Sequence, residues 1–277
     1  MATHQTLIAL SSEPIAEKLV FELKNYSQQL GVSLHTLGDS IFNGTYHCAR
    51  WQSSHHLENP QREALRGLAS KFNTDLCFLK ADFIVQDIRI LAMDMDSTLI
   101  NIECIDEIAD FTGKKAAVAE ITEATMRGEI QDFKESLRRR VALLEGVPAH
   151  TLEAVYRERL RPNPGAAELL LGAHERGIYT LLVSGGFTFF TEKLRNQYDL
   201  KQTQANTLEI INGKLTGKVL GEIVDGLAKA AHLDEACNRL GCTKANAITM
   251  GDGANDLIMM NNSGISVAYR AKPVVKE

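Results

Sequence analysis

The sequence lacks the features that mark secreted, membrane-bound and nucleic-acid-binding proteins. Its five cysteines are odd in number and form no CxxC pair, which predicts reduced thiols in the cytoplasm rather than a disulfide framework. No basic segment with a cleavage site opens the chain, and no apolar run is long enough to cross a bilayer. A formal net charge of −5 argues against a nucleic-acid partner. What remains is a cytoplasmic globular protein of 277 residues, enough for one large or two ordinary domains.

The first 85 residues predict a separate, ferredoxin-like domain with the element order βαββαβ. Strands are expected at 6–11, 32–38, 45–52 and 75–83, and helices at 13–31 and 59–73. No motif in this domain indicates chemistry. The spacing of its histidines, His47, His55 and His56 among them, suits no common metal site.

From residue 86 to 277 the pattern becomes an alternation of apolar strands and helices. The expected strands are 88–93, 178–184, 246–251 and 264–269. Alternation of this kind predicts an α/β domain with a Rossmann-like parallel sheet core. A charged helical insertion at about 104–160 is a candidate cap over the sheet. The Asn212-Gly213 pair predicts a separate β-hairpin.

Two carboxylates directly follow the first of these strands, in the stretch MDMDSTLI. Because side chains alternate along a strand, Asp94 and Asp96 are expected to point to the same side. Two neighbouring anions repel each other unless a proton or a cation compensates them. The pair therefore predicts a functional site at the end of this strand.

Further polar residues are expected at the same edge of the sheet, where α/β folds bind their ligands. They are Ser184, Gly185, Lys229, Asp252, Asn255 and Asp256. A hydroxyl beside backbone N–H groups that glycine frees can hold an anion. Each feature alone is more often structural, since a Ser-Gly-Gly is usually a turn and a single lysine is usually solvated. Their convergence on one edge favours a site.

These stretches resemble the motifs of a known superfamily. DMDST, VSGGF, Lys229 and GDGANDLIMM resemble the four motifs of the haloacid dehalogenase-like phosphatases. The cap segment and the hairpin resemble those of the phosphoserine phosphatases in particular, and the N-terminal domain resembles the ACT-like domain that some members carry. Members generally continue for another strand and helix beyond the point where this chain ends at AKPVVKE, so a shortened C-terminus is expected.

For the chemistry, the resemblance implies a Mg²⁺-dependent reaction through an aspartyl-phosphate. Asp94 would attack phosphorus, and Asp96 would protonate the departing serine oxygen and later deprotonate a water molecule. The implied metal ligands are the Asp94 carboxylate, the Asp96 backbone carbonyl and Asp252, with Asp256 as outer-shell support. The implied phosphoryl ligands are Ser184, Gly185, Lys229 and Asn255.

For the substrate, the resemblance implies that Glu103 and Arg140 bind the amino and carboxyl groups of phosphoserine. Helical geometry separates Arg140 from its neighbours Arg138 and Arg139, which are expected in solvent. At ~100° per residue, Arg140 lies only about 60° from the centre of an apolar stripe, whereas Arg139 points away. That stripe consists of Phe133, Leu137, Val141 and Leu144.

The resemblance thus implies a cytoplasmic phosphatase that makes L-serine from a small-molecule substrate, without a membrane partner and with a homodimer as one candidate state. One alternative is a related phosphatase or phosphotransferase acting on another small phosphomonoester. A second is a non-enzymatic amino-acid sensor built on the N-terminal domain. Intact Asp94, Asp96, Lys229 and Asp252 argue against the sensor, which needs none of them.

Overall fold

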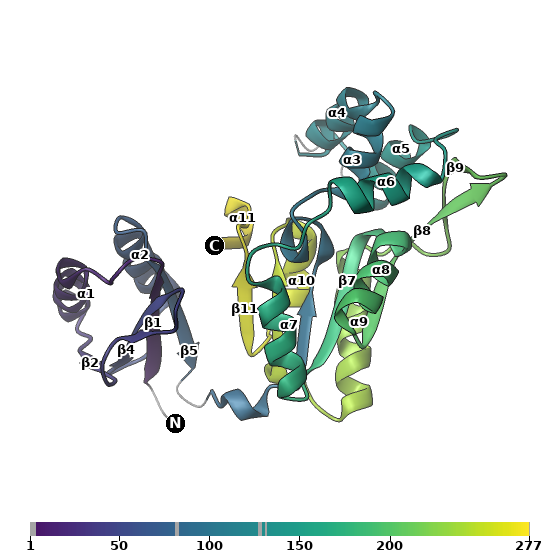
Figure 1. Ribbon diagram of the computed structural model, residues 1–277. Coiled ribbons are helices and arrows are strands. Elements are labelled where there is room, and N and C mark those ends of the chain that lie inside the picture. The colour runs from purple at the N-terminus through teal and green to yellow at the C-terminus, as the bar shows by residue number, and fades with distance from the viewer. Residues whose placement is uncertain (1–3, 81–82, 127–128, 131, 277) are drawn as a thin grey trace. The chain divides into compact units, whose positions relative to one another are not determined.

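The structure is a computed structural model of the chain in which residues 4–80, 83–126, 129–130 and 132–276 are described (Figure 1). The chain divides into two compact units, Met1–Val85 and Gln86–Glu277. Each unit has hydrophobic clusters of its own.

The N-terminal unit is a four-stranded antiparallel sheet, extended by a short extra strand, with two helices. Its elements are β1 (Gln5–Ser11), α1 (Glu17–Gln29), β2 (Leu34–Thr36), β3 (Ile41–Phe42), β4 (His47–Ser53), α2 (Asn59–Ser70) and β5 (Asp75–Lys80). The order β2-β4-β1-β5 confirms the ferredoxin-like prediction, while β3, which pairs with β4, was not predicted. Of the predicted strand 75–83, residues 81–82 lie outside the described part of the chain.

Helix α1 begins later than its sequence pattern indicates. Its first residue is Glu17, and Ala16 before it is extended, with φ −62° and ψ 131°. Pro14 therefore precedes the helix rather than opening it. A proline disfavours the helical conformation in the residue before it, which is consistent with a non-helical entry.

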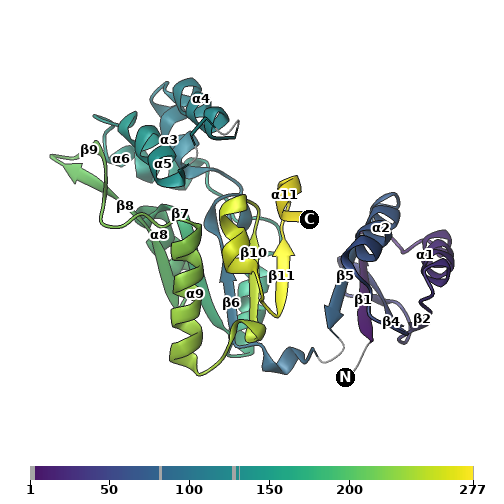
Figure 2. The same cartoon turned by 180° about the vertical axis from the view of Figure 1, so that it is seen from behind.

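The second unit is built on a six-stranded sheet in the order β11-β10-β6-β7-β8-β9. Its strands are β6 (Ile90–Met93), β7 (Tyr179–Phe187), β8 (Gln202–Ile211), β9 (Lys214–Leu220), β10 (Ala247–Gly251) and β11 (Ile265–Ala268). Its sheet-packing helices are α7 (Ala166–Glu175), α8 (Thr188–Tyr198), α9 (Gly226–Leu240), α10 (Leu257–Met260) and α11 (Pro273–Lys276). Helix α7 lies on the side of the sheet facing the viewer in Figure 1, and α9 and α10 lie on the side facing the viewer in Figure 2.

The sheet is parallel from β11 to β8, as predicted, and antiparallel only at its β8–β9 edge. The hairpin expected around Asn212-Gly213 is present, and both residues have positive φ, 50° and 74°. It is not separate from the sheet, because the first half of β8 pairs with β7 and only its second half pairs with β9.

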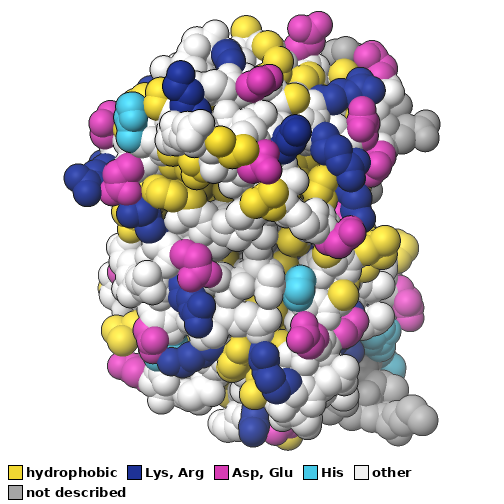
Figure 3. Space-filling view, turned by 90° about the vertical axis from the view of Figure 1, so that its right-hand side faces the viewer, with side chains coloured by type: hydrophobic (Ala, Val, Ile, Leu, Met, Phe, Trp, Pro, Cys, Tyr) yellow, Lys and Arg dark blue, Asp and Glu magenta, His cyan; other side chains and the backbone are white. Residues whose placement is uncertain are grey.

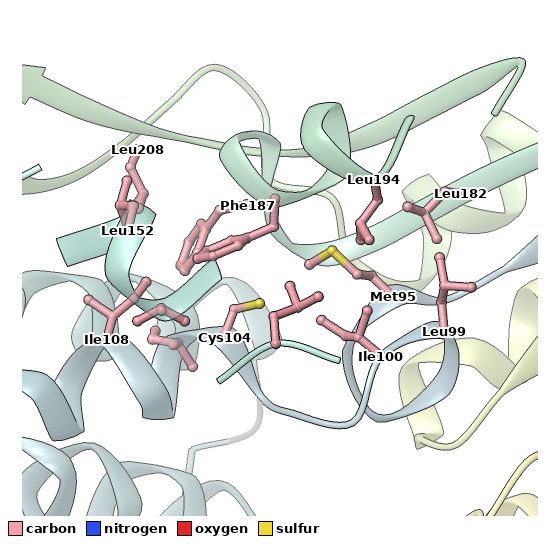
Figure 4. Packing of buried hydrophobic residues seen from close by; sticks show 14 of the residues in the cluster. Met95, Leu99, Ile100, Cys104, Ile108, Leu152, Leu182, Phe187, Leu194 and Leu208 are labelled. Carbon is pink, nitrogen blue, oxygen red and sulfur yellow. The ribbon is translucent and has the colours of Figure 1, made fainter. Parts of the chain in front are cut away.

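Four helices form the predicted cap between β6 and α7. They are α3 (Cys104–Phe111), α4 (Lys115–Met126), α5 (Phe133–Ala142) and α6 (His150–Glu158). They gather beyond one end of the sheet in Figure 1. One hydrophobic cluster runs from the cap into the sheet layer, and Figure 4 shows Cys104, Ile108 and Leu152 of the cap packed near Phe187 of β7. The cap thus packs directly on the core of its unit.

Three features of the structure bear on the composition of the chain: its surface charges, its helix lengths and its cysteines. Acidic and basic side chains are interspersed over the face shown in Figure 3. Within the described ranges, no helix has the length and apolar character needed to cross a bilayer. All five cysteines are free: Cys104 and Cys237 are buried, Cys48 and Cys242 are half-buried, and Cys77 is exposed.

Candidate active site

The chain leaves β6 through a turn, Met95–Leu99, in which Asp96 and Ser97 are not helical, and this corrects the strand-based argument for Asp94 and Asp96. The strand ends at Met93, so alternation along a strand does not orient the two carboxylates. Asp94 instead caps the turn, accepting a hydrogen bond from the Met95 N–H at 2.7 Å. Ser97 has a φ of 57° within the turn. The charge of Asp94 nevertheless contributes to raising the pKa of Asp96, so the two carboxyl groups influence each other electrostatically.

A buried lysine links Asp94 to the loop after β10. Lys229 of α9 is completely buried, and its Nζ lies 2.8 Å from Asp94 Oδ1 and 2.7 Å from Asp256 Oδ1. Burial raises the pKa of Asp94 to about 7, against the opposing charge of Lys229. Burial of the ammonium lowers the pKa of Lys229, but the negative charges of Asp94 and Asp256 outweigh this effect, so the pKa is raised overall. The lysine is therefore a permanent cation at the centre of an acidic cluster.

Asp252 and Asp256 complete this cluster, but their surroundings differ. Oxygen atoms of Asp94, Asp252 and Asp256 lie within 4.8 Å of one another. Asp256 accepts three protein donors, because besides Lys229 it accepts the N–H groups of Asp252 and Gly253 at 3.2 and 3.1 Å. Asp252 accepts a 3.2 Å hydrogen bond from the Thr98 hydroxyl. Burial is the main cause that raises the pKa of Asp252, followed by the charge of Asp256.

The donor set of this cluster fits a hard divalent cation. Three buried carboxylates face a single buried ammonium, so negative charge is in excess. Carboxylate and carbonyl oxygens are the ligands that Mg²⁺ takes in proteins. Asp94 and Asp252 accept fewer protein donors than Asp256, so they are the better candidates to give an oxygen to a metal.

Asp96 lies in a different environment from Asp94. Burial raises the pKa of Asp96 well above its usual value, and the charge of Glu103 adds to this effect. Its Oδ1 atom is buried and, among the described residues, has no hydrogen-bond partner. Its Oδ2 atom packs against Gly186, where a Cβ atom would come within 2.8 Å of it. A buried carboxyl that favours its protonated form suits a proton donor.

The Ser184-Gly185-Gly186 stretch is a continuation of strand β7, not the turn that glycine usually marks. The positive-φ glycines of the described chain do not include Gly185 or Gly186, so both serve close approach rather than backbone freedom. A Cβ on Gly185 would lie 2.9 Å from the Phe133 ring of the cap. The buried Ser184 hydroxyl accepts the Gly186 N–H at 2.8 Å, which leaves its own hydrogen available to an anion.

Two residues that support this edge were missed from the sequence. Asn206 of β8 is buried, donates to the Gly185 carbonyl at 2.8 Å and accepts the Val224 N–H at 2.9 Å. Thr98, whose hydroxyl donates to Asp252, belongs to the DMDST stretch but was not predicted as a site residue. The only sequence signal for Thr98 is its place in that motif. The sequence around Asn206 has no feature that distinguishes Asn206 from an asparagine in a surface loop.

Asn255 lies in the loop that carries Asp256, on the short turn Ala254–Asp256. Its backbone carbonyl closely approaches Gly226 at the start of α9, where a Cβ atom would lie only 2.8 Å away. This contact seats the Asn255 loop against the helix that carries Lys229.

Glu103 and Arg140 belong to the cap side of the same region. The Glu103 Oε1 atom accepts the Ser97 hydroxyl at 2.7 Å. Glu103 is exposed as a whole residue, but burial is the largest cause that raises the pKa of its carboxyl group. The carboxyl group therefore lies closer to protein than the exposure of the whole residue indicates. The charge of Lys272 opposes that rise, and the Lys272 N–H holds the Asp252 carbonyl at 3.0 Å.

Arg140 and Arg139 differ as helical geometry predicts. Arg139 is exposed and pairs with Glu135 at 2.8 Å. Arg140 is half-buried, and its only hydrogen bond in the described part of the chain is a long one, 3.5 Å, to the Ser136 carbonyl. Burial lowers the pKa of Arg140, while the charges of Asp106, Glu103 and Asp96 oppose the shift. No carboxylate within the described ranges pairs with Arg140, so this cation is free to meet an anionic ligand.

Comparison with known proteins finds similarity in sequence and in fold. Residues 91–261 match the family model of the haloacid dehalogenase-like hydrolases. A phosphoserine phosphatase of Polaromonas sp. (strain JS666) is 56% identical over 200 residues, covering 71% of this chain and 85% of the relative.

Two solved structures extend the similarity. A probable phosphoserine phosphatase from Vibrio cholerae aligns with a TM-score of 0.78 and 34% identity, over 98% of this chain and 80% of its own. A structure described as a phospho-aspartyl intermediate analogue of phosphoserine phosphatase has a TM-score of 0.64 and 37% identity, over 68% of this chain and 90% of its own.

Proposed function

We propose that this chain, which belongs to the haloacid dehalogenase-like hydrolases, hydrolyses O-phospho-L-serine to L-serine and phosphate. One observation carries the choice of substrate: Arg140 is half-buried and lacks a carboxylate partner among the described residues, while its charge interacts with that of Glu103. A cation and an anion beside one phosphatase site match the carboxylate and ammonium of an amino acid.

In the first step, an oxygen of Asp94 attacks phosphorus, and the bond from phosphorus to the serine oxygen breaks. Both protein contacts of the carboxylate described above, from the Met95 N–H and Lys229, are made to Oδ1, which leaves Oδ2 open to a ligand. Asp96 gives its proton to the departing serine oxygen, because an alkoxide is a poor leaving group. The raised pKa of Asp96 supports this role.

In the second step, Asp96 removes a proton from a water molecule, which attacks the phosphorus of the aspartyl-phosphate. The bond from phosphorus to Asp94 breaks, and inorganic phosphate leaves. Asp94 regains its carboxylate and Asp96 its proton, so the site is ready for another cycle.

The phosphoryl oxygens are held by groups at the edge of the sheet. We assign this role to Ser184, the Gly185 N–H, Lys229 and Asn255. Mg²⁺ bound by Asp94, Asp252 and the Asp96 backbone carbonyl would supply further positive charge to those oxygens. Asp256 positions Lys229 and the loop after β10 through the hydrogen bonds it already makes.

Arg140 would meet the substrate carboxylate with two parallel hydrogen bonds, and Glu103 would accept the ammonium. Since Arg140 lies on cap helix α5 and Glu103 precedes cap helix α3, both contacts would draw the cap onto bound substrate. The wider proposal is a cytoplasmic enzyme of the last step of serine biosynthesis, with an ACT-like N-terminal domain and a possible homodimeric state.

The test is a phosphate-release assay with phosphoserine, phosphothreonine, a sugar phosphate and p-nitrophenyl phosphate, each with Mg²⁺ and with EDTA. We expect kcat/KM to be highest for phosphoserine and activity to require Mg²⁺. A higher kcat/KM for a sugar phosphate would favour the second candidate, a phosphatase for another small phosphomonoester.

A further inference from the structure

Two linkers join the cap to the sheet, and they run side by side. The first leads from the Met95–Leu99 turn to Glu103, and the second leads from α6 back to α7. Ile100 and Pro162 form an antiparallel bridge between them. The Asn101 N–H donates to the Arg161 carbonyl at 3.0 Å, and the Asn101 side chain accepts the Arg161 N–H at 2.8 Å.

Asn163 of the second linker makes the most contacts across this ribbon. It is buried, with 5% of its surface exposed. Its side-chain amide donates to the carbonyls of Thr98 and Ile100, each at 2.9 Å. Its backbone N–H donates to the Leu99 carbonyl at 2.9 Å. One side chain thus satisfies two backbone acceptors of the turn that follows Asp96, and an amide NH₂ group has just two hydrogens to give.

The atoms that Asn163 holds are directly connected to the site. Thr98, whose carbonyl it binds, donates its hydroxyl to Asp252. The neighbouring Ser97 donates its hydroxyl to Glu103, and the Ser97 N–H donates to the Ile102 carbonyl at 3.2 Å. Asn163 therefore acts on the backbone that places both the Asp252 support and the proposed ammonium-binding carboxylate.

We infer that Asn163 is a positioning residue, which fastens the Thr98–Ile100 backbone so that Glu103 is held in the orientation that recognises the amino-acid part of the substrate. The inference rests on the proposed function for its consequence in catalysis. Leaving two buried carbonyls without donors costs far more than losing exposed hydrogen bonds, so the turn would rearrange in the absence of the amide.

The test compares Asn163→Leu, which keeps the branching at Cγ and removes the donors, with Asn101→Ala as a matched control. Asn101 lies on the same ribbon but is exposed, and its side chain does not hold the turn. Asn163→Ser, which keeps one short donor, serves if the leucine variant is insoluble. The readout is the ratio of kcat/KM for phosphoserine to that for p-nitrophenyl phosphate, because a smaller folded fraction lowers both values equally.

We expect Asn163→Leu to lower this ratio about tenfold and to raise KM for phosphoserine, with a smaller change in Asn163→Ser. Asn101→Ala should leave the ratio unchanged. Equal losses on both substrates in Asn163→Leu, or the same fall in ratio in Asn101→Ala, would overturn the inference.

A second measurement separates this inference from the proposed function. Hydrogen exchange of the Ser97 and Ile100 amides should be at least about tenfold faster in Asn163→Leu than in the wild-type protein. Unchanged exchange would overturn the fastening role whatever the substrate. A wild-type enzyme that does not prefer phosphoserine would overturn the proposed function, and the exchange rates would still decide whether Asn163 fastens the turn.

Discussion

Lys229 Nζ lies 2.8 Å from Asp94 Oδ1, and the lysine side chain is completely buried. This ion pair joins helix α9 to the end of β6, and the 2.7 Å contact of the same ammonium with Asp256 joins both to the loop after β10. Three separate segments of the chain are therefore held together by one cation at the proposed phosphoryl site.

Replacement of this cation is expected to make stability depend strongly on pH. In metal-free buffer, Lys229→Met should lose about 3 kcal/mol or more of unfolding free energy at pH 8, because Asp94 and Asp256 stay buried without a positive charge to compensate theirs. The folded-state pKa of Asp94 is already raised to about 7 by burial, above its unfolded value of 3.8. The folded state then binds more protons, so the free energy of unfolding falls as pH rises through this window.

The loss of unfolding free energy in Lys229→Met, relative to the wild-type protein, should accordingly be smaller at pH 5 than at pH 8. Thermal unfolding in EDTA measures this loss. Lys201→Met is the control, because Lys201 is exposed and pairs with Asp199 on the surface. It should show little loss at either pH. A deficit in Lys229→Met that grows toward acid would show that the ion pair is not what stabilises this site.

Asp94→Asn and Asp96→Asn should both lose turnover of phosphoserine, but for different reasons. An amide at position 94 is no nucleophile, so no phosphate and no intermediate should form. At position 96 the nucleophile remains, and p-nitrophenolate leaves without help from an acid. Asp96→Asn should thus give a burst of p-nitrophenolate followed by slow release, measured by stopped flow, while Asp94→Asn gives no burst. Phosphate release by Asp94→Asn would rule out the covalent mechanism.

Mg²⁺ should stabilise the folded protein through the acidic cluster. At a concentration 100 times its Kd, a ligand adds about 2.7 kcal/mol, which for a unit of this size raises Tm by about 5 to 10 °C. Differential scanning fluorimetry with and without Mg²⁺ measures the shift. Asp252→Asn should reduce it sharply, whereas Asp234→Asn, which removes a largely exposed carboxylate paired with Lys244, should keep it. An undiminished shift in Asp252→Asn would place the metal elsewhere.

Arg140→Ala should weaken phosphoserine turnover far more than turnover of p-nitrophenyl phosphate. The loss in kcat/KM for phosphoserine should correspond to about 2 kcal/mol or above, the value of a hydrogen-bonded charge. Arg139→Ala is the matched control, since Arg139 is exposed and bound to Glu135. It should barely affect either substrate. Equal losses on both substrates for Arg140→Ala would mean that the arginine supports the fold or the phosphate.

A chain that begins at Gln86 should still hydrolyse phosphoserine. Every proposed site residue lies in the unit Gln86–Glu277, and this unit has hydrophobic clusters of its own. Circular dichroism first establishes that the shortened chain is folded, and the phosphate-release assay then measures its kcat/KM. A folded but inactive chain would show that the N-terminal unit completes the site.

Features that depend on neighbours in the chain could be read from the sequence alone. The apolar pattern of 88–93 predicted the buried strand that forms at Ile90–Met93, and Asn212-Gly213 predicted a hairpin turn that needs two positive φ angles. The rotation of ~100° per helical residue separated Arg140 from Arg139. These predictions succeed because backbone sterics and helical periodicity act over a few residues, whatever the rest of the chain does. The same reasoning was wrong for Asp94 and Asp96, where the strand gives way to a tight turn.

The contacts that make the site were decided by the tertiary structure. Thr98 meets Asp252 across 154 residues of chain, Asn163 holds Thr98 across 65, and Lys229 reaches Asp256 across 27. None of these separations carries a periodic signal. Each of these residues is of a common polar type that is usually exposed to solvent. They come together because burying the apolar faces of the sheet and cap brings their backbones close, and a buried polar group is stable only where a partner compensates the water it has lost.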